Sequence, residues 1–492
     1  MIDEYINERL KKIEKLKELN INPYPQIIIK NKKSSEQLLK KYEKISHEKS
    51  NKLEEFAGRM IGFRSMGKIS FSHLQDEFGK MQIVFQKKET KNYDLLKLTD
   101  IGDILFVKGY FFKTKKGEIS ILAKEFIIAS KSIRPLPEKF HGINDDELRL
   151  RKRELDAIMN REVIEKFKKK SFIVKSLREF LDNNGFLEVQ TPVLQTTYGG
   201  ASAEPFITHH NALDLNLYLR IAPEIYLKRM ITAGFEKIYE LGNKYRNEGM
   251  DKSHLQEILD IEFYWAYQDY ENLMKFTEEL ISYVLKKVNG SLKINYQGQI
   301  IDFTPPYKRI TFRELLIKNT GIDIDKFNNF KLLKKEIVKK KIKDVDINSP
   351  KHYGALLDEL YKRTARQKII QPTFMTDYPV EMIPLAKRKE NNPSKISSFQ
   401  LLVNSWELIK AYDELNDPVD QRKRFVEQQK FIELGDREAH PLDEDFIESM
   451  ELGMPPIAGW GMGLARFCML LMDEPNIRES VFFPLMKPEN KK

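Results

Sequence analysis

The chain of 492 residues contains a single cysteine, Cys468, and this scarcity limits its chemistry. One cysteine forms no internal disulfide bond, and it cannot supply a zinc site built on several thiolates. Because Cys468 lies in the apolar run 467–472, we expect a buried, unreactive thiol. No apolar run approaches the roughly 20 residues that span a bilayer, and no signal peptide opens the chain. The sequence therefore predicts a cytoplasmic protein without a membrane segment.

Acidic residues are fewer than basic residues in this chain. The chain has 83 Lys and Arg against 73 Asp and Glu, which gives a formal net charge of +10. Such a balance favours a polyanionic partner such as RNA, although basic composition by itself is not specific. The length is sufficient for two or three domains with substantial cores.

The hydrophobic period changes near residue 53. Residues 3–19 carry apolar residues at helical spacing between mixed charges, which fits a solvated amphipathic helix or a basic arm that contacts RNA. After residue 53, short apolar runs separated by turn residues predict a small barrel. We expect its strands at 56–63, 80–85, 104–112 and 118–127. Phe71 lies among alternating polar residues, a pattern that suits stacking on unpaired bases, unless Phe71 belongs to the core.

One stretch between Tyr239 and Tyr264 reads as an apolar strand, a polar loop and a return strand. We expect Arg246 and Glu248 to lie on the same face of the first strand, because strand residues alternate faces. Glu262 and Tyr264 repeat this arrangement on the return strand. An arginine beside carboxylates suits a zwitterionic substrate held against a phosphate. A structural ion pair is the alternative.

A second stretch, rich in glycine, runs from Gly453 to the apolar helix that we expect at 467–472, with Arg466 at the junction. Glycines allow a backbone to approach a ligand closely, and the start of a helix offers free N–H groups to anions. The pattern indicates a nucleotide site.

Together the two stretches resemble motifs two and three of the class II aminoacyl-tRNA synthetases, and the match, from about Glu54 to Pro488, is with the lysyl-tRNA synthetases in particular. The resemblance implies an α+β fold with an N-terminal OB-fold β-barrel and a class II catalytic domain, in which helices flank an antiparallel sheet. The implied domains are a helical extension (1–52), the OB-fold that binds the anticodon (53–133), a linker (134–155) and the catalytic domain (156–492), with a lysine-rich insertion near 322–352 that looks solvated.

For the reaction, the resemblance implies ATP-dependent ligation of L-lysine to tRNA(Lys) through a lysyl-adenylate, with ATP as substrate and Mg²⁺ as cofactor. In-line attack of the lysine carboxylate on the α-phosphate needs no protein nucleophile, so catalysis is positioning and charge stabilisation. The catalytic residues that the resemblance implies are Arg246, Glu248 and Arg466. The ATP-binding set is Arg246, Glu248, His254, Glu257, Ile258, Glu407, Gly463 and Arg466, and the metal ligands are Glu407 and Gln400.

The lysine site implied in the same way consists of Gly200, Glu224, Arg246, Glu262, Tyr264, Lys410 and Glu414. Glu224 would hold the α-ammonium and Glu414 the ε-ammonium, since a buried cation needs a carboxylate partner. Phe71, Gln82 and Glu125 would face the anticodon. A helix ending at Gly185 and a strand expected at 186–194, interrupted by proline, resemble motif one. That motif implies a homodimer, and pairing would cover an open strand edge.

The chain departs from its family at four informative positions. Gln400 replaces a metal-binding Glu, Ile258 replaces a Phe that stacks on adenine, Ala465 replaces an Asp, and Lys410 replaces an Asn. We expect Lys410 to contact the substrate carboxylate; the alternative is that it neutralises Glu414. Two other interpretations stay open: a catalytically weakened paralogue that acts as an RNA-binding or regulatory module, and a synthetase of the aspartate or asparagine type. An acidic substrate, however, would need a cation where Glu414 stands.

Overall fold

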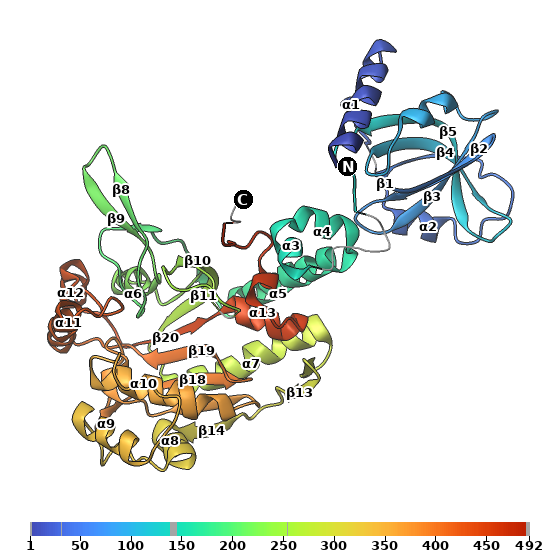
Figure 1. Cartoon of the computed structure of the whole chain (residues 1–492). Helices are drawn as coiled ribbons and strands as arrows, with labels where there is room; N and C mark the ends of the chain where they lie inside the picture. The colour runs from blue at the N-terminus through green and yellow to red at the C-terminus, as the bar shows by residue number, and fades with distance from the viewer. Residues whose placement is uncertain (1, 31, 138–144, 253, 489–492) are drawn as a thin grey trace. The chain divides into compact units, whose positions relative to one another are not determined.

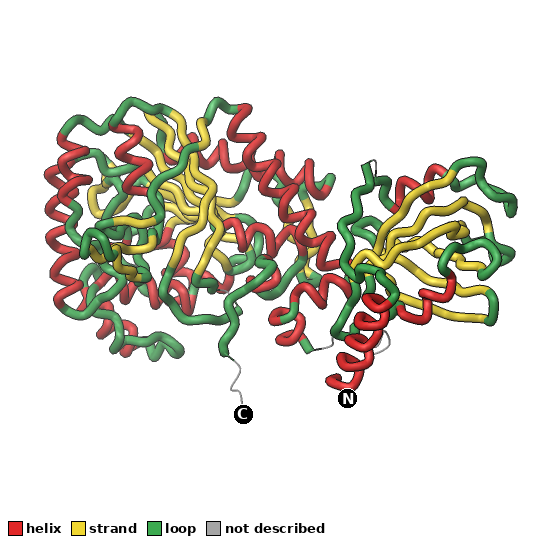
Figure 2. Tube along the Cα trace, turned by 90° about the horizontal axis from the view of Figure 1, so that it is seen from above, coloured by secondary structure: helices red, strands yellow, loops and turns green. Residues whose placement is uncertain are grey.

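The computed structural model describes residues 2–30, 32–137, 145–252 and 254–488. These residues form two compact units, one of residues 1–149 and 154–160 and the other of residues 150–153 and 161–492 (Figure 1). The expected α+β class is confirmed, with a barrel in the first unit and a large sheet with helices in the second (Figure 2). No helix in the described ranges is long and apolar enough to cross a membrane.

The first unit is a closed five-stranded barrel with the strand order β1-β2-β3-β5-β4. Its strands are β1 (Leu53–Met66), β2 (Ile69–Gln75), β3 (Lys80–Gln86), β4 (Ile104–Lys113) and β5 (Ile119–Ser130). Alternate residues fill the interior, among them Phe56, Phe85 and Phe111, which are fully buried. The four expected strands are present, whereas β2 and the short helix η1 (Tyr93–Leu98) had not been expected as separate elements.

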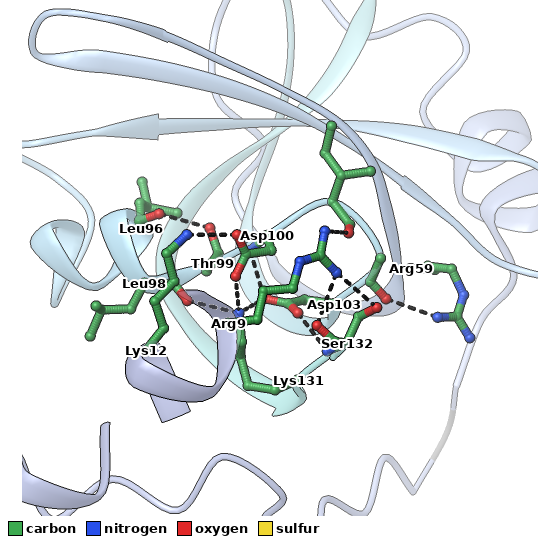
Figure 3. A network of polar contacts seen from close by, with 12 residues as sticks. Arg9, Lys12, Arg59, Leu96, Leu98, Thr99, Asp100, Asp103, Lys131 and Ser132 are labelled. Carbon is green, nitrogen blue, oxygen red and sulfur yellow. Dashed lines mark hydrogen bonds and ion pairs between the residues drawn. The ribbon is translucent and has the colours of Figure 1, made fainter. Parts of the chain in front are cut away.

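The N-terminal helix α1 (Ile2–Glu18) packs one face on this barrel. Ile13 and Leu16 are buried as expected, but Leu10 of the predicted stripe is exposed and Arg9 is buried in its place. The Arg9 guanidinium donates hydrogen bonds to the carbonyl oxygens of Ser132 at 2.9 Å and Ile101 at 3.1 Å (Figure 3). The helix is therefore amphipathic as expected, with its apolar face packed on the barrel, while RNA contact by its outer face stays a prediction.

Behind Arg9 lies a buried cluster of charges. Lys131 Nζ, with no exposed side-chain surface, lies 2.6 Å from Asp100 Oδ2 and 2.7 Å from Asp103 Oδ2 (Figure 3). Lys12 of α1 reaches Asp100 Oδ1 at 2.6 Å. Burial raises the pKa of Asp103, and the Lys131 ammonium opposes that rise. Since buried charges persist only when paired, this network fixes α1 to the barrel.

The expected linker at 134–155 falls partly outside the described residues. Of its described part, residues 134–137 lie in no helix or strand, whereas α3 (Asp146–Arg151) and the start of α4 (Arg153–Met159) are helical.

The second unit is built on an eight-stranded sheet with the order β14-β15-β18-β19-β20-β11-β10-β6. Its strands are β6 (Leu187–Glu188), β10 (Lys237–Tyr245), β11 (Glu257–Ala266), β14 (Lys308–Thr311), β15 (Thr373–Thr376), β18 (Ser398–Val403), β19 (Trp406–Asp413) and β20 (Ile457–Met462). The five strands β15, β18, β19, β20 and β11 pair antiparallel with one another. Three small sheets, β7 (Leu194–Gln195) with β8 (Ile207–His210) and β9 (Leu215–Leu219), β12 (Lys293–Tyr296) with β13 (Gln299–Asp302), and β16 (Arg388–Lys389) with β17 (Asn392–Ile396), complete the strands.

Helices cover the large sheet on both faces (Figure 1). The face that we call the core face carries α5 (Arg161–Asn183), α7 (Tyr270–Asn289) and α13 (Leu464–Met472). The second hydrophobic cluster joins the other face to α6 (Glu224–Thr232), α8 (Phe312–Thr320), α9 (Phe330–Lys339), α10 (Tyr353–Thr364), α11 (Pro418–Glu433) and α12 (Glu444–Glu451). We call this second face the site face.

Three expectations about this unit need correction. The strand expected at 186–194 is reduced to the two short strands β6 and β7 near its ends, because Pro192 lacks an N–H and Thr191 donates its N–H to the Glu240 carboxylate at 3.2 Å. The lysine-rich segment is not a solvated insertion, because Leu333 and Ile337 of α9 are buried in the core. Helix α13 begins three residues before the expected start.

The expectation for the cysteine is confirmed. Cys468 is fully buried in α13, and burial raises the pKa of its thiol to about 12.

Candidate active site

A strip of backbone without side chains crosses the site face along β20. Gly459 pairs with Tyr264 of β11 and with Tyr412 of β19, and Gly461 pairs with Glu262 and Lys410 in the same way. Each glycine therefore lies between two residues with large side chains, one on β11 and one on β19. A Cβ at Gly459 would collide with the carboxylate of Glu414 and lie 2.8 Å from the Tyr264 ring, and one at Gly461 would lie 3.3 Å from Glu262 Cγ. The glycine strip (Gly459 and Gly461) is therefore a place where only backbone fits.

Three buried carboxylates, Glu224, Glu262 and Glu414, lie around this strip and form what we call the carboxylate cluster. Glu224 begins α6 and is 4% exposed. The Tyr412 hydroxyl lies 2.9 Å and 2.8 Å from its two oxygens, and Lys228 Nζ lies 2.6 Å from Oε1. The predicted residue Gly200 lies beside it at φ +84°, where a Cβ would be 2.8 Å from Glu224 Cβ. Gly200 is thus required by both its conformation and its neighbour.

Glu414 follows β19 and is 1% exposed. Its Oε2 forms an ion pair with Lys228, whereas Oε1 has no hydrogen-bond partner among the described residues. Burial raises the pKa of this carboxyl well above its usual range, and the Lys228 ammonium opposes the rise. A buried carboxylate oxygen without a partner is costly unless a ligand supplies a donor. The arrangement suits a cation.

Glu262 and Tyr264 form the opposite side of the strip. The Tyr264 hydroxyl donates a hydrogen bond to Glu262 Oε2 at 3.4 Å. Burial raises the pKa of Glu262 to about 7, the Glu224 and Glu240 carboxylates add to the rise, and the Lys244 ammonium opposes it. Near neutral pH this carboxyl is therefore poised to take up or release a proton.

Lys410 stands across Gly461 from Glu262, next to Gln400 on β18. Its ammonium lies 5.9 Å from the centre of the Tyr412 ring. Lys410 and Tyr412 therefore lie on the same face of β19, as residues two apart on a strand do. Glu414 lies one residue beyond the strand, and its carboxylate converges on the same place through Lys228.

Arg246 and Glu248 are not strand neighbours, so that prediction is wrong. β10 ends at Tyr245, and only one further backbone bond, from Arg246 N to Gln256 O at 2.9 Å, continues toward the return strand. The buried Nε of Arg246 has no hydrogen-bond partner in the described part of the chain. An unpaired buried guanidinium nitrogen suits an oxyanion.

Arg466 lies in the first turn of α13. Its Nη1 donates to the backbone oxygen of Glu407 at 3.1 Å. Burial lowers the pKa of Arg466, while the Glu407 carboxylate favours its charged form. Gly463 precedes this helix and has room for a small side chain, because the nearest atom to a Cβ there, Asp260 Oδ1, is 3.8 Å away.

The remaining residues of the predicted ATP site lie near the loop after β10. His254 is exposed, with its Nδ1 2.8 Å from Asp251 Oδ2. The exposed Glu257 accepts a hydrogen bond from Asn243 Nδ2 at 2.6 Å. The Glu248 backbone oxygen lies 3.4 Å from the side-chain amide of Gln256.

Ile258 packs against a small apolar cluster that also contains Ala465. The other buried members of this cluster are Leu255, Met469 and Ile477. Two departures from the family pattern, Ile258 and Ala465, therefore belong to one apolar contact region beside the start of α13.

The two predicted metal ligands differ in how well they fit a cation. Gln400 is 6% exposed, and its side-chain oxygen accepts a hydrogen bond from the Tyr361 hydroxyl at 3.3 Å. Across the described ranges, no group of three or more His, Cys, Asp or Glu is arranged to hold a metal. Glu407 alone offers a carboxylate. Since Mg²⁺ is often bound by one or two carboxylates plus substrate phosphates, the fit depends on oxygens from ATP.

Sequence reasoning missed four charged or polar residues of the site face: Lys228, Tyr412, Lys244 and Asp260. Lys244 forms a buried ion pair with Asp260, whose Oδ1 accepts a hydrogen bond from Leu464 N at 3.3 Å. Burial, together with the charges of Arg246 and Arg466, lowers the pKa of Lys244 to about 7. Alternation along β11 could have placed Asp260 on the site face, because it lies two residues before Glu262 and side chains two apart on a strand share a face. Helical spacing could have paired Lys228 with Glu224, because it follows Glu224 by one helical turn and lies on the same side of the helix.

In the barrel, Phe71 and Gln82 lie on the neighbouring strands β2 and β3. Phe71 is half-buried and outside the barrel core, so the core alternative is wrong. The side chain of Gln82 accepts a hydrogen bond from Ser120 Oγ at 2.7 Å. Glu125 lies on β5, where it pairs with Lys108 of β4.

The chain is similar to proteins of known families over both units. The family described as tRNA synthetases class II (D, K and N) matches residues 145–487, and the family described as OB-fold nucleic acid binding domain matches residues 55–129.

Three relatives named lysine–tRNA ligase illustrate the similarity. The one from Thermoanaerobacter pseudethanolicus is 46% identical, over 99% of this chain and 97% of its own length. That from Fervidobacterium nodosum is 44% identical over 99% and 95%, and that from Thermotoga maritima is 44% identical over 99% and 97%. With the antiparallel sheet and the barrel described above, this chain belongs to the class II tRNA synthetase family, in its lysine–tRNA ligase branch.

Proposed function

We propose that the protein joins L-lysine to tRNA(Lys) in two steps, through a lysyl-adenylate made from ATP. The observation that carries this proposal is the carboxylate cluster beside the glycine strip, with the unpaired Oε1 of Glu414. Lysine is the amino acid whose chain ends in a primary ammonium, and buried carboxylates bind such a cation when its other hydrogen bonds are satisfied. An aspartate or asparagine side chain would meet repulsion or an unmet charge in the same place.

In this proposal the residues of the site divide the substrate between them. Glu414 receives the ε-ammonium with help from Tyr264 and Glu262, and Glu224 beside Gly200 receives the α-ammonium. The aliphatic stem lies on the glycine strip. Lys410 contacts the substrate carboxylate.

Arg246 and Arg466 stabilise charge on the α-phosphate while the lysine carboxylate attacks it. No protein nucleophile takes part, so the rate comes from positioning and from fixed charges. Glu248, His254 and Glu257 orient ATP, with Ile258 and Gly463 bordering the nucleotide. Glu407 would hold Mg²⁺ together with ATP oxygens, and the ion would supply charge neutralisation; Gln400 would hold it less strongly, because its oxygen is neutral and already accepts one hydrogen bond from Tyr361.

The partners and boundaries follow the family. Residues 53–133 bind the anticodon through Phe71, Gln82 and Glu125, after an extension at 1–52. Residues 134–155 connect this domain to the catalytic domain at 156–492. Two chains form a homodimer in the cytoplasm.

Lysine-dependent exchange of pyrophosphate into ATP tests the proposal. The purified chain is assayed with each standard amino acid and with ornithine, and then for charging of tRNA(Lys). We expect exchange with lysine to exceed exchange with every other amino acid by a wide margin. Faster exchange with aspartate or asparagine would contradict the substrate assignment, and the absence of exchange with any amino acid would favour the regulatory alternative.

A further inference from the structure

Lys228 is the least accessible charged group of the site. It lies one helical turn after Glu224 on α6, and its side chain has no exposed surface. Its ammonium is 2.6 Å from Glu224 Oε1, is ion-paired with Glu414 Oε2, and lies 5.8 Å from the ring centres of Tyr412 and Phe446. Burying an ammonium is unfavourable unless carboxylates surround it, and Lys228 meets that condition twice.

We propose that Lys228 is a positioning and specificity-determining residue of the lysine site, which fixes Glu224 and Glu414 so that each offers its remaining oxygen to one ammonium of the substrate. The inference rests on the proposed function. Lys228 occupies one oxygen of each carboxylate, and the free Oε1 of Glu414 lies over Gly459. Without Lys228, Glu414 would lose its ion-pair partner, Glu224 would keep only the Tyr412 hydroxyl, and the two carboxylates would repel each other.

The charges of the site face support this role. The carboxylate cluster carries three negative charges when ionised, and Lys228 cancels one. Two remain, which equals the number of ammonium groups on lysine. Two neighbouring charges are already paired, Glu240 with Arg220 and Lys244 with Asp260, and Arg246, which favours the charged form of Glu262, is assigned to the α-phosphate.

Lys410 completes the balance, because it has one positive charge for the substrate carboxylate. An amino acid with one ammonium would leave a carboxylate of the cluster uncompensated. Lys228 thus sets the site to accept a substrate with two ammonium groups rather than one or three.

The test compares Lys228→Met with Lys237→Met. Lys237 is a suitable control because it lies on the same sheet but on the core face, where its ammonium is 4.4 Å from the Trp265 ring centre and donates to Asn184 O at 3.1 Å. Circular dichroism and melting curves report folding. Pyrophosphate exchange gives KM for lysine, KM for ATP and kcat.

We expect Lys228→Met to raise KM for lysine at least 100-fold, to leave KM for ATP within about twofold, and to reduce the preference for lysine over norleucine, which carries one ammonium. Lys237→Met should alter melting only. Lys228→Arg keeps the positive charge that stabilises the cluster but places it on a planar guanidinium group. This variant serves as the test if Lys228→Met does not fold. Lys228→Arg should raise KM for lysine at least tenfold.

Three results would overturn the inference. Unchanged KM for lysine in folded variants would make Lys228 a purely structural residue. Tighter lysine binding in Lys228→Met would mean that its ammonium competes with the substrate for Glu414. If the unchanged chain shows no lysine-dependent exchange, the proposed function fails, and the role of Lys228 fails with it.

Discussion

The two faces of the eight-stranded sheet use the same strands for opposite purposes. On β11 the core-face residue Phe263 stacks on Trp460 with ring centres 4.7 Å apart, whereas the next residues, Glu262 and Tyr264, point into the carboxylate cluster. The core face consists of interlocking aromatic and aliphatic groups. The site face holds charges that are buried but incompletely paired. Because neighbouring residues of a strand point to opposite faces, a residue of the aromatic core and a residue of the site stand next to each other in the sequence.

This difference has an energetic meaning. Burial of apolar side chains stabilises a fold by about 25 cal/mol per Å² of surface removed from water. Burial of a carboxylate such as Glu414 works against folding until a partner compensates it. A site of this kind therefore depends for its stability on the hydrophobic clusters of both faces, and in the proposed function substrate binding supplies part of the missing compensation.

The largest effect should come from breaking the core face. Phe263→Ala removes a fully buried ring between Phe186 and Trp460, and we expect it to lower the free energy of unfolding by about 3–5 kcal/mol. The lysine KM of the folded fraction should stay near that of the unchanged chain. Denaturant titration and exchange kinetics measure the two quantities. A lysine KM that rises in proportion to the loss of stability would show that the faces are not separate.

The converse change is Glu414→Gln on the site face. Truncation of a buried charge partner costs about 2–5 kcal/mol of interaction, so kcat/KM for lysine should fall by about 30-fold to several thousand-fold. Because the change also removes a buried charge, the melting temperature should fall little or rise, although Lys228 loses one of its partners. Unaltered kcat/KM in this variant would remove Glu414 from the lysine site.

A smaller effect concerns pH. Glu262 has its pKa raised to about 7, so below that pH it is protonated and attracts an ammonium less strongly. We expect kcat/KM for lysine at saturating ATP to rise by up to about tenfold per pH unit below pH 7 and to level off above it. Glu262→Gln should give a lower, flat profile. If that variant keeps the slope, the titrating group is another one, with Lys244 the first candidate.

The smallest effect should come from the nucleotide side. Ile258 packs beside Ala465 where the family has an aromatic ring that stacks on adenine. Ile258→Phe should lower KM for ATP by about two- to tenfold, since aromatic stacking contributes about 0.5–1.5 kcal/mol. Lysine KM should not change, and Lys237→Met serves again as the control for stability. A higher KM for ATP would indicate that the added ring overfills the apolar cluster.

The fold class was predicted from the family resemblance, and the sequence pattern predicted the barrel strands β1, β3, β4 and β5 and the pair β10 and β11, because alternation and turn residues are local signals. It failed where a side chain replaced a backbone partner: Thr191 bonds to Glu240, so the strand expected at 186–194 is broken into β6 and β7. It also failed for Arg9, whose burial depends on carbonyl groups more than 90 residues away in the chain.

The candidate site divides in the same manner. Glu262, Tyr264 and Glu414 were found from motif resemblance, and the structure brings them together around Gly459. The partners of these residues were not found, since no motif records that Lys228 lies between two carboxylates or that Tyr412 bonds to Glu224. Such contacts join α6 to β19, and only the folded chain brings these segments together.

The central claim is that lysine lies on the glycine strip, between the members of the carboxylate cluster. The most direct measurement is titration calorimetry of L-lysine into the unchanged chain and into Gly459→Ala. Gly62→Ala in the barrel is a matched control, because a Cβ there meets nothing closer than 3.9 Å. The claim predicts one lysine site per chain in the unchanged protein and in Gly62→Ala, and no detectable binding in a folded Gly459→Ala. Lysine binding to Gly459→Ala with the Kd of the unchanged chain would contradict it.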